Sequence, residues 1–139
     1  MKGTILLAVD ATKVAARAAE LVTDLVSEGH NDVAVLHVHQ VATGRWGQLI
    51  LDHEAEGECV AELTARDLIA AGVRVTAMSA AVPMGHVAAE IARIADRVEA
   101  DLIVMGTHNE SDVSSITLGS TSHRVLHLAH RPILLVPAV

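Results

Sequence analysis

Residues 101–121 read DLIVMGTHNESDVSSITLGST, and this stretch decides how the rest of the chain is organised. It begins with an apolar run, Leu102 to Met105, whose length and β-branched residues are typical of a strand buried on both faces of a sheet. A polar loop begins at Thr107, and Gly119 and Ser120 introduce a helical pattern. The order of strand, polar loop and helix predicts backbone N–H groups and a helix N-terminus at the carboxyl edge of a parallel sheet, where phosphates are commonly held.

The remainder of the chain alternates in the same way between short apolar runs and segments with helical spacing. Apolar runs predict further strands at residues 5–9, 33–38 and 133–136, and alternating apolar and mixed residues predict an edge strand at 73–78. Apolar residues at helical spacing predict helices between Thr12 and Gly29 and over about residues 52–71, 87–98 and 120–129. Residues 43–47, which include two glycines, are predicted to form a loop. Five strands alternating with four helices predict an α/β fold, with right-handed crossovers and helices on both faces of the sheet.

The composition fits a single domain that spans residues 1–139. Hydrophobic residues make up 51% of the chain, but Phe and Tyr are absent, so the core must be built from aliphatic side chains and Met. A net charge of −7 disfavours binding to nucleic acid or to an anionic membrane. The single cysteine, Cys59, suits a reducing compartment, and the apolar run from Thr4 to Val9 is too short for a signal peptide or a membrane span. We therefore expect a cytoplasmic protein.

Four segments together carry a family resemblance: ILLAVD at residues 5–10, VLHV at 35–38, DLIVMGTH at 101–108 and RPILLV at 131–136. In these segments the chain resembles the universal stress protein family, and the resemblance extends over nearly the whole chain. It implies a Rossmann-like fold with four helices and a five-stranded parallel sheet, whose order is 3-2-1-4-5 when the strands are numbered along the chain. It also implies a homodimer that forms through the last strand, Ile133 to Val136.

The ATP-binding branch of that family carries the motif G-x2-G-x9-G-(S/T), whose glycines and small hydroxyl residues wrap the phosphates. Here Gly106 matches the first glycine, and Gly119 and Ser120 match the closing pair. Asn109 stands in place of the second glycine. Asn enters the left-handed backbone region more readily than most other non-glycine residues, which favours retention of the backbone cradle.

The charge of this loop opposes phosphate binding. Between Gly106 and Thr121 there is no Lys or Arg, whereas Glu110 and Asp112 contribute two negative charges. Each carboxylate within ~4–6 Å of a triphosphate would cost on the order of 1 kcal/mol. A Mg²⁺ ion, or Lys13 at the start of the first helix, could offset this repulsion.

The resemblance implies a site for ATP or another adenine nucleotide, such as AMP or cyclic AMP. The residues that would line it are Val9, Asp10, Ala11, Thr12, Val38, Met105, Gly106, Asn109, Gly119, Ser120 and Thr121. Asp10 would contact the adenine or ribose edge, but an acidic residue in a turn near a helix N-terminus is also stabilised by the helix dipole. Val38 would either pack on the adenine ring or belong to the core.

Nine histidines raise the question of a metal site. His37 and His39 lie two apart on a predicted strand and so point to the same face, and His123 and His127 lie at i and i+4 on a predicted helix. Such helical spacing arises by chance in a His-rich chain, and no carboxylate or cysteine stands at a recognisable ligand spacing. We therefore predict no metal site, and we expect His37 to be buried and hydrogen-bonded.

The sequence offers no catalytic motif, because it has neither a G-x-S-x-G elbow nor a P-loop lysine. We expect a protein that is not an enzyme, with slow ATP hydrolysis as the most that its site would catalyse. The predicted function is that of a stress-response or signalling module that binds an adenine nucleotide. The alternative is a family member that has lost nucleotide binding and acts through dimerisation and protein partners.

Overall fold

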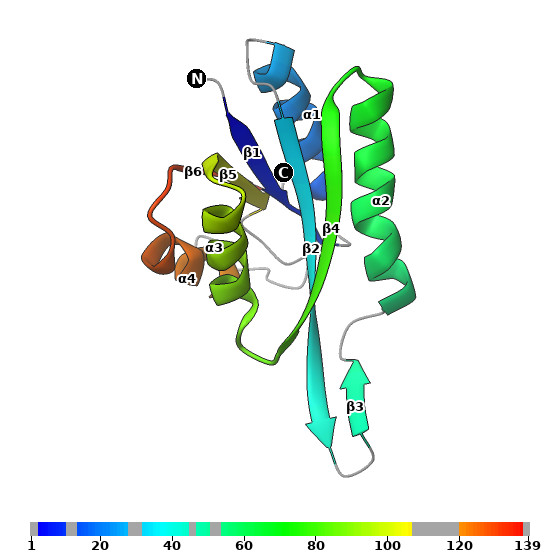
Figure 1. The fold of residues 1–139 in the computed structure, drawn as a ribbon, viewed down its shortest axis with the longest axis vertical. Helices are drawn as coiled ribbons and strands as arrows, with labels where there is room; N and C mark the ends of the chain where they lie inside the picture. Colours follow the sequence, from blue (N-terminus) through cyan, green and yellow to red (C-terminus); the bar gives the residue numbers. More distant parts are fainter. Residues whose placement is uncertain are drawn as a thin grey trace.

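Strand β1 (Thr4–Ala8) occupies the centre of a parallel sheet, and the other elements are arranged around it (Figure 1). This computed structural model describes residues 3–10, 14–27, 32–44, 47–50, 54–106 and 120–137. The strands after β1 are β2 (Asp32–Gly44), β3 (Gly47–Ile50), β4 (Arg74–Pro83), β5 (Ala100–Gly106) and β6 (Ile133–Val136). The helices are α1 (Val14–Ser27), α2 (Glu54–Ala70), α3 (Val87–Arg97) and α4 (Ser120–Leu128).

The parallel strands lie in the order β4-β2-β1-β5-β6. β1 pairs with β2 on one side, where Leu7 lies opposite Val35, and with β5 on the other, where Leu7 lies opposite Val104. When these five strands are numbered along the chain, the order is 3-2-1-4-5, which confirms the predicted α/β fold and sheet order. The order reverses at β1, so the carboxyl ends of β1 and β5 form the switch point at which such sheets bind ligands.

Helices cover both faces of the sheet, as predicted, and the core is therefore divided into two layers. Ile5 and Leu7 of β1 belong to the layer beneath α1 and α2, whereas Leu6 belongs to the layer beneath α3 and α4. All three side chains are fully buried, and each such burial contributes about 1.5–3 kcal/mol. Because both faces are covered, the central strands are continuous apolar runs. Among the described residues, no helix is long and apolar enough to cross a membrane.

The loop predicted at residues 43–47 is wrong for Thr43, Gly44 and Gly47, because these residues lie in two paired strands. β2 continues to Gly44, and β3 pairs antiparallel with its end, so that Thr43 lies opposite Gln48 and Gly44 lies opposite Gly47. Residues 45 and 46 lie outside the described residues. Gly44 and Gly47 pair with each other at the ends of the two strands, which extend beyond the other strands of the sheet (Figure 1).

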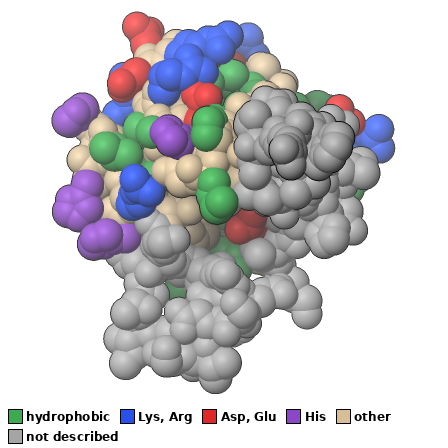
Figure 2. All heavy atoms as spheres, turned by 90° about the horizontal axis from the view of Figure 1, so that it is seen from below, with side chains coloured by type: hydrophobic (Ala, Val, Ile, Leu, Met, Phe, Trp, Pro, Cys, Tyr) green, Lys and Arg blue, Asp and Glu red, His purple; other side chains and the backbone are tan. Residues whose placement is uncertain are grey.

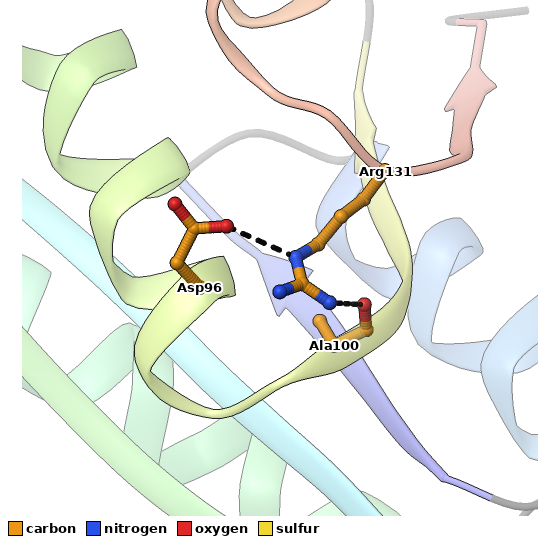
Figure 3. A network of polar contacts seen from close by, with 3 residues as sticks. All are labelled: Asp96, Ala100 and Arg131. Atoms are coloured by element: carbon orange, nitrogen blue, oxygen red, sulfur yellow. Dashed lines mark hydrogen bonds and ion pairs between the residues drawn. The ribbon is translucent and has the colours of Figure 1, made fainter.

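Arg131 joins three parts of the chain near the start of β5. Its Nε atom lies 3.2 Å from Oδ1 of Asp96 in α3, and a terminal N–H group donates to the carbonyl oxygen of Ala100, 2.6 Å away (Figure 3). The bond to Ala100 is partly buried, whereas the contact with Asp96 is exposed to water. Arg131 precedes Pro132, whose carbonyl oxygen accepts a hydrogen bond from the Ile103 N–H group at 2.9 Å. The network therefore holds the entry to β6 against α3 and β5.

Replacing Arg131 by Met tests this network, because Met keeps much of the aliphatic stem and removes the charge. We expect the free energy of unfolding to fall by about 2 kcal/mol, since the carbonyl oxygen of Ala100 loses a charged donor. The measurement is urea denaturation followed by circular dichroism.

The matched control is Arg93→Met. Arg93 forms an ion pair with Glu90 one turn away on α3, and its side chain is largely exposed. Exposed pairs of this kind contribute about 0–1 kcal/mol, so the control is expected to lose less stability than Arg131→Met. Equal losses in the two variants would show that the contact with Ala100 does not stabilise the fold.

Candidate functional site

The carboxyl ends of β1 and β5 lie side by side, with β2 on the other side of β1. Ala8 pairs with Met105 of β5 and with Leu36 of β2. The alignment with β2 continues past the end of β1, because the Val9 N–H group donates to the carbonyl oxygen of Leu36 at 2.8 Å. The predicted site residues that meet at this edge are Val9, Asp10, Val38, Met105 and Gly106.

Three of these residues place their side chains in the core. Val9 packs in the layer beneath α1 and α2, whereas Val38 and Met105 pack in the layer beneath α3 and α4. All three are buried, and Asp10 is exposed. The interpretation of Val38 as a core residue therefore applies in this structure, and Asp10 is the polar side chain that follows β1 at the switch point.

Gly106 ends β5 at a point where two other elements approach closely. A Cβ atom added to Gly106 would lie 2.7 Å from Cγ1 of Val14 in α1 and 3.8 Å from the carbonyl oxygen of Val136 in β6. Two carbon atoms in favourable contact are ~3.5–4.0 Å apart, so a larger residue here would force the side chain of Val14 to shift. Packing against Val14 therefore favours a glycine at this position, whether or not a ligand binds.

Ser122 fixes the start of α4 against the end of β5. Its hydroxyl group donates to the carbonyl oxygen of Gly106 at 2.8 Å, and the residue is almost fully buried. The first N–H groups of a helix have no partner within the helix and carry the positive end of its dipole. Because α4 begins at Ser120, this positive end lies close to the end of β5. Sequence analysis missed Ser122, and its place two residues after the closing pair of the motif was the one signal for it.

The remaining predicted residues are described less fully. Ser120 and Thr121 form the start of α4, and Thr121 is partly buried. Outside the described residues lie Ala11, Thr12, Asn109 and Gly119, and also Lys13, Glu110 and Asp112. The structure therefore brings together the predicted residues of β1, β2 and β5 and places the start of α4 beside them.

His37, in the middle of β2, links that strand to the end of β1. Its Nδ1 atom donates to the carbonyl oxygen of Val9 at 2.8 Å, which confirms the expectation that His37 is buried and hydrogen-bonded. The residue is 5% exposed, and His39, which is 6% exposed, packs edge-on against it with ring centroids 4.6 Å apart. Nδ1 of His39 has no hydrogen-bond partner among the described residues. The bond from His37 sets the position of Val9 and hence of Asp10, which follows it.

These two histidines offer a matched pair of variants. His37→Leu is expected to lower the free energy of unfolding by about 1–3 kcal/mol, because the buried carbonyl oxygen of Val9 loses its donor. His39→Leu removes a buried polar atom for which the described part of the chain offers no partner, so we expect a change close to zero or a gain in stability. Chemical denaturation of both variants measures the difference, and a larger loss for His39→Leu would contradict the assignment of the bond.

The fold and this edge define a protein of the Rossmann-like α/β class with a switch point between β1 and β5. The profile of the universal stress protein family matches residues 1–137. A universal stress protein of Methanocaldococcus jannaschii is 31% identical over 140 residues, which cover 95% of this chain and 80% of that protein. One from Synechocystis is 34% identical over 138 residues, which cover 96% of this chain and 85% of that protein. The chain belongs to the universal stress protein family.

Solved structures agree with this assignment. A universal stress protein family member from Burkholderia pseudomallei matches with a TM-score of 0.75 at 25% identity, covering 98% of this chain and 96% of that one. A universal stress protein in complex with cAMP matches with a TM-score of 0.71 at 17% identity, covering 97% and 96%. The universal stress protein from Archaeoglobus fulgidus in complex with dAMP matches with a TM-score of 0.69 at 20% identity, covering 96% and 97%. At the last two identities, the likeness shows the fold alone.

Proposed function

We propose that this chain binds an adenine nucleotide and acts as a stress-response or signalling module in the cytoplasm, without being an enzyme. The ligand would be ATP or another adenine nucleotide, such as AMP or cyclic AMP. For a triphosphate, Mg²⁺ would offset the negative charge of the loop before α4.

The observation that carries this proposal is the hydrogen bond from Ser122 to Gly106. It holds the positive end of the α4 dipole beside the end of β5, next to the point where the strand order reverses. The spacing between Gly106 and Gly119 is that of the phosphate-binding motif. Two proteins with this fold are known in complex with cAMP and dAMP. A nucleotide with its phosphates at α4 and its ribose or adenine edge at Asp10 would use both sides of the switch point.

A second candidate function is favoured by the charge of the loop. Glu110 and Asp112 lie within the motif, and no Lys or Arg lies between Gly106 and Thr121 to balance them. A family member in which this repulsion prevents phosphate binding would act through its dimer and through protein partners. The two functions can therefore be distinguished by how much the two carboxylates reduce the affinity for a nucleotide.

The triple variant Asn109→Gly, Glu110→Ser and Asp112→Gly measures that cost. We expect it to bind ATP more tightly than the wild type by roughly tenfold or more, since removal of each carboxylate is worth on the order of 1 kcal/mol. The gain should be smaller for adenosine, which has no phosphate, and should shrink as the salt concentration rises. Isothermal titration calorimetry with ATP, AMP, cyclic AMP and adenosine provides the affinities.

Two controls separate charge from other effects. Glu110→Asp combined with Asp112→Glu keeps both charges and is expected to bind ATP as the wild type does. Adding Gly119→Val to the triple variant should abolish binding, because a branched side chain would occupy the place where the phosphate approaches the backbone. A triple variant that binds no nucleotide would reject the nucleotide proposal and leave the partner-binding module.

We also propose that the protein is a homodimer that forms through β6. β6 pairs with β5 on one side and is the last strand of the described sheet. An apolar strand at the edge of a sheet presents unpaired N–H and C=O groups, and antiparallel pairing with a second copy would satisfy them. Leu134 in the middle of this strand is 37% exposed, so its side chain is available to a partner.

Leu134→Lys is expected to convert the dimer to a monomer, because it places a charge in the apolar contact. Leu63→Lys is the control, since Leu63 is 54% exposed but lies on α2, away from β6. Sedimentation equilibrium gives the mass of each variant. A wild-type protein that is monomeric at tens of micromolar would contradict the proposed dimer.

A further inference from the structure

His123 and His127 lie about one helical turn apart on the exposed side of α4. Their Nε2 atoms are 3.3 Å apart, and their ring centroids are 4.7 Å apart with the ring planes inclined at 72°. Figure 2 shows histidine side chains gathered along one flank of the surface that it displays. The exposed histidines among the described residues are His86, His123, His127 and His130.

The separation of the two Nε2 atoms is the one that a tetrahedral metal ion would set. Two Zn–N bonds of ~2.0–2.1 Å that meet at the tetrahedral angle place their nitrogen atoms ~3.3–3.4 Å apart. A hydrogen bond from an N–H group is usually shorter, at ~2.7–3.2 Å. The H-E-x-x-H motif also holds zinc with two histidines at i and i+4 on one face of a helix.

The packing of α4 holds both imidazoles on the solvent side. Ser122 and Val125 on the inner side of the helix are buried, and Ser122 is bonded to the end of β5. Arg124 donates to the carbonyl oxygen of Gly85 at 3.0 Å, so its guanidinium group is held by the turn before α3. These contacts fix the rotation of α4, so a metal ion would meet two ligands on a helix that is already oriented.

We propose that His123 and His127 bind one divalent transition-metal ion, with Zn²⁺ as the best match, through both Nε2 atoms. Among the described residues, no third His, Cys, Asp or Glu joins this pair in a metal-binding group, so water or an external donor would complete the coordination. A proton that one Nε2 donates to the other must move to Nδ1 or leave, because each ligand atom needs its lone pair. The site does not depend on nucleotide binding.

This proposal differs from the prediction of no metal site. Helical spacing alone does not distinguish a chance pair from a pair of ligands. The distance between the two Nε2 atoms fits both a hydrogen bond and a shared metal ion, so metal titration decides between them.

Titration of the tag-free protein with ZnCl₂ alone, followed by calorimetry, tests the site. We expect one ion per chain, and we expect His123→Gln and His127→Gln each to weaken binding at least tenfold. Nitrogen NMR of the wild type should show that the Nε2 resonances of both histidines shift when Zn²⁺ is added. Lower pH should weaken binding, since protons compete with the metal for the imidazole lone pairs.

Two control variants are used. One keeps the number of histidines, and the other leaves helix α4 unchanged. The double variant H127Q/L128H has the same number of histidines but moves the second imidazole by about 100° around the helix, so it should lose affinity as His127→Gln does. His130→Gln should bind Zn²⁺ as the wild type does. Circular dichroism confirms that each variant is folded. Equal affinity in the wild type, His123→Gln and His127→Gln would overturn the proposal, as would a loss confined to His130→Gln.

Discussion

β1 is buried on both faces, and this constraint determines where the protein can meet a ligand. Ile5, Leu6 and Leu7 are all fully buried between the two layers of helices, so these three side chains are not available to a ligand. The first exposed polar side chain after the strand is that of Asp10. Any small molecule that uses the centre of the sheet must therefore approach along the carboxyl edge, where backbone groups and helix N-termini are within reach.

Polar side chains fix the strand ends, and each does so through a backbone carbonyl group. His37 holds the carbonyl oxygen of Val9 after β1, Ser122 holds that of Gly106 at the end of β5, and Arg131 holds that of Ala100 at its start. Apolar packing determines which side chains of each strand are buried, but it does little to determine where each strand ends. These hydrogen bonds are directional, and they set the geometry of the edges at which the loops begin.

The helices and most of the strands were predictable because their signals are local, whereas the order of the strands was implied by the family resemblance. Apolar runs mark the central strands, and helical spacing marks the helices between them. The hairpin of β2 and β3 was missed because Gly44 and Gly47 indicate a turn without showing that the flanking residues pair. Gly106 and Val14 approach closely although they lie far apart in the chain, and neither residue type predicts this contact. Ser122 was missed because Ser120 and Thr121, which precede it, are also small and polar.

Because Gly106 packs closely against Val14, this motif glycine can be kept even in a protein that does not bind a nucleotide. In a lineage that no longer needed a ligand, the residues of the loop would be free to drift, but the first glycine would remain under selection for packing against α1. Conservation of this glycine would then suggest ligand binding, although its cause would be steric. By itself, Gly106 therefore does not distinguish a nucleotide site from close packing against Val14, and the spacing to Gly119 and the start of α4 is needed as well.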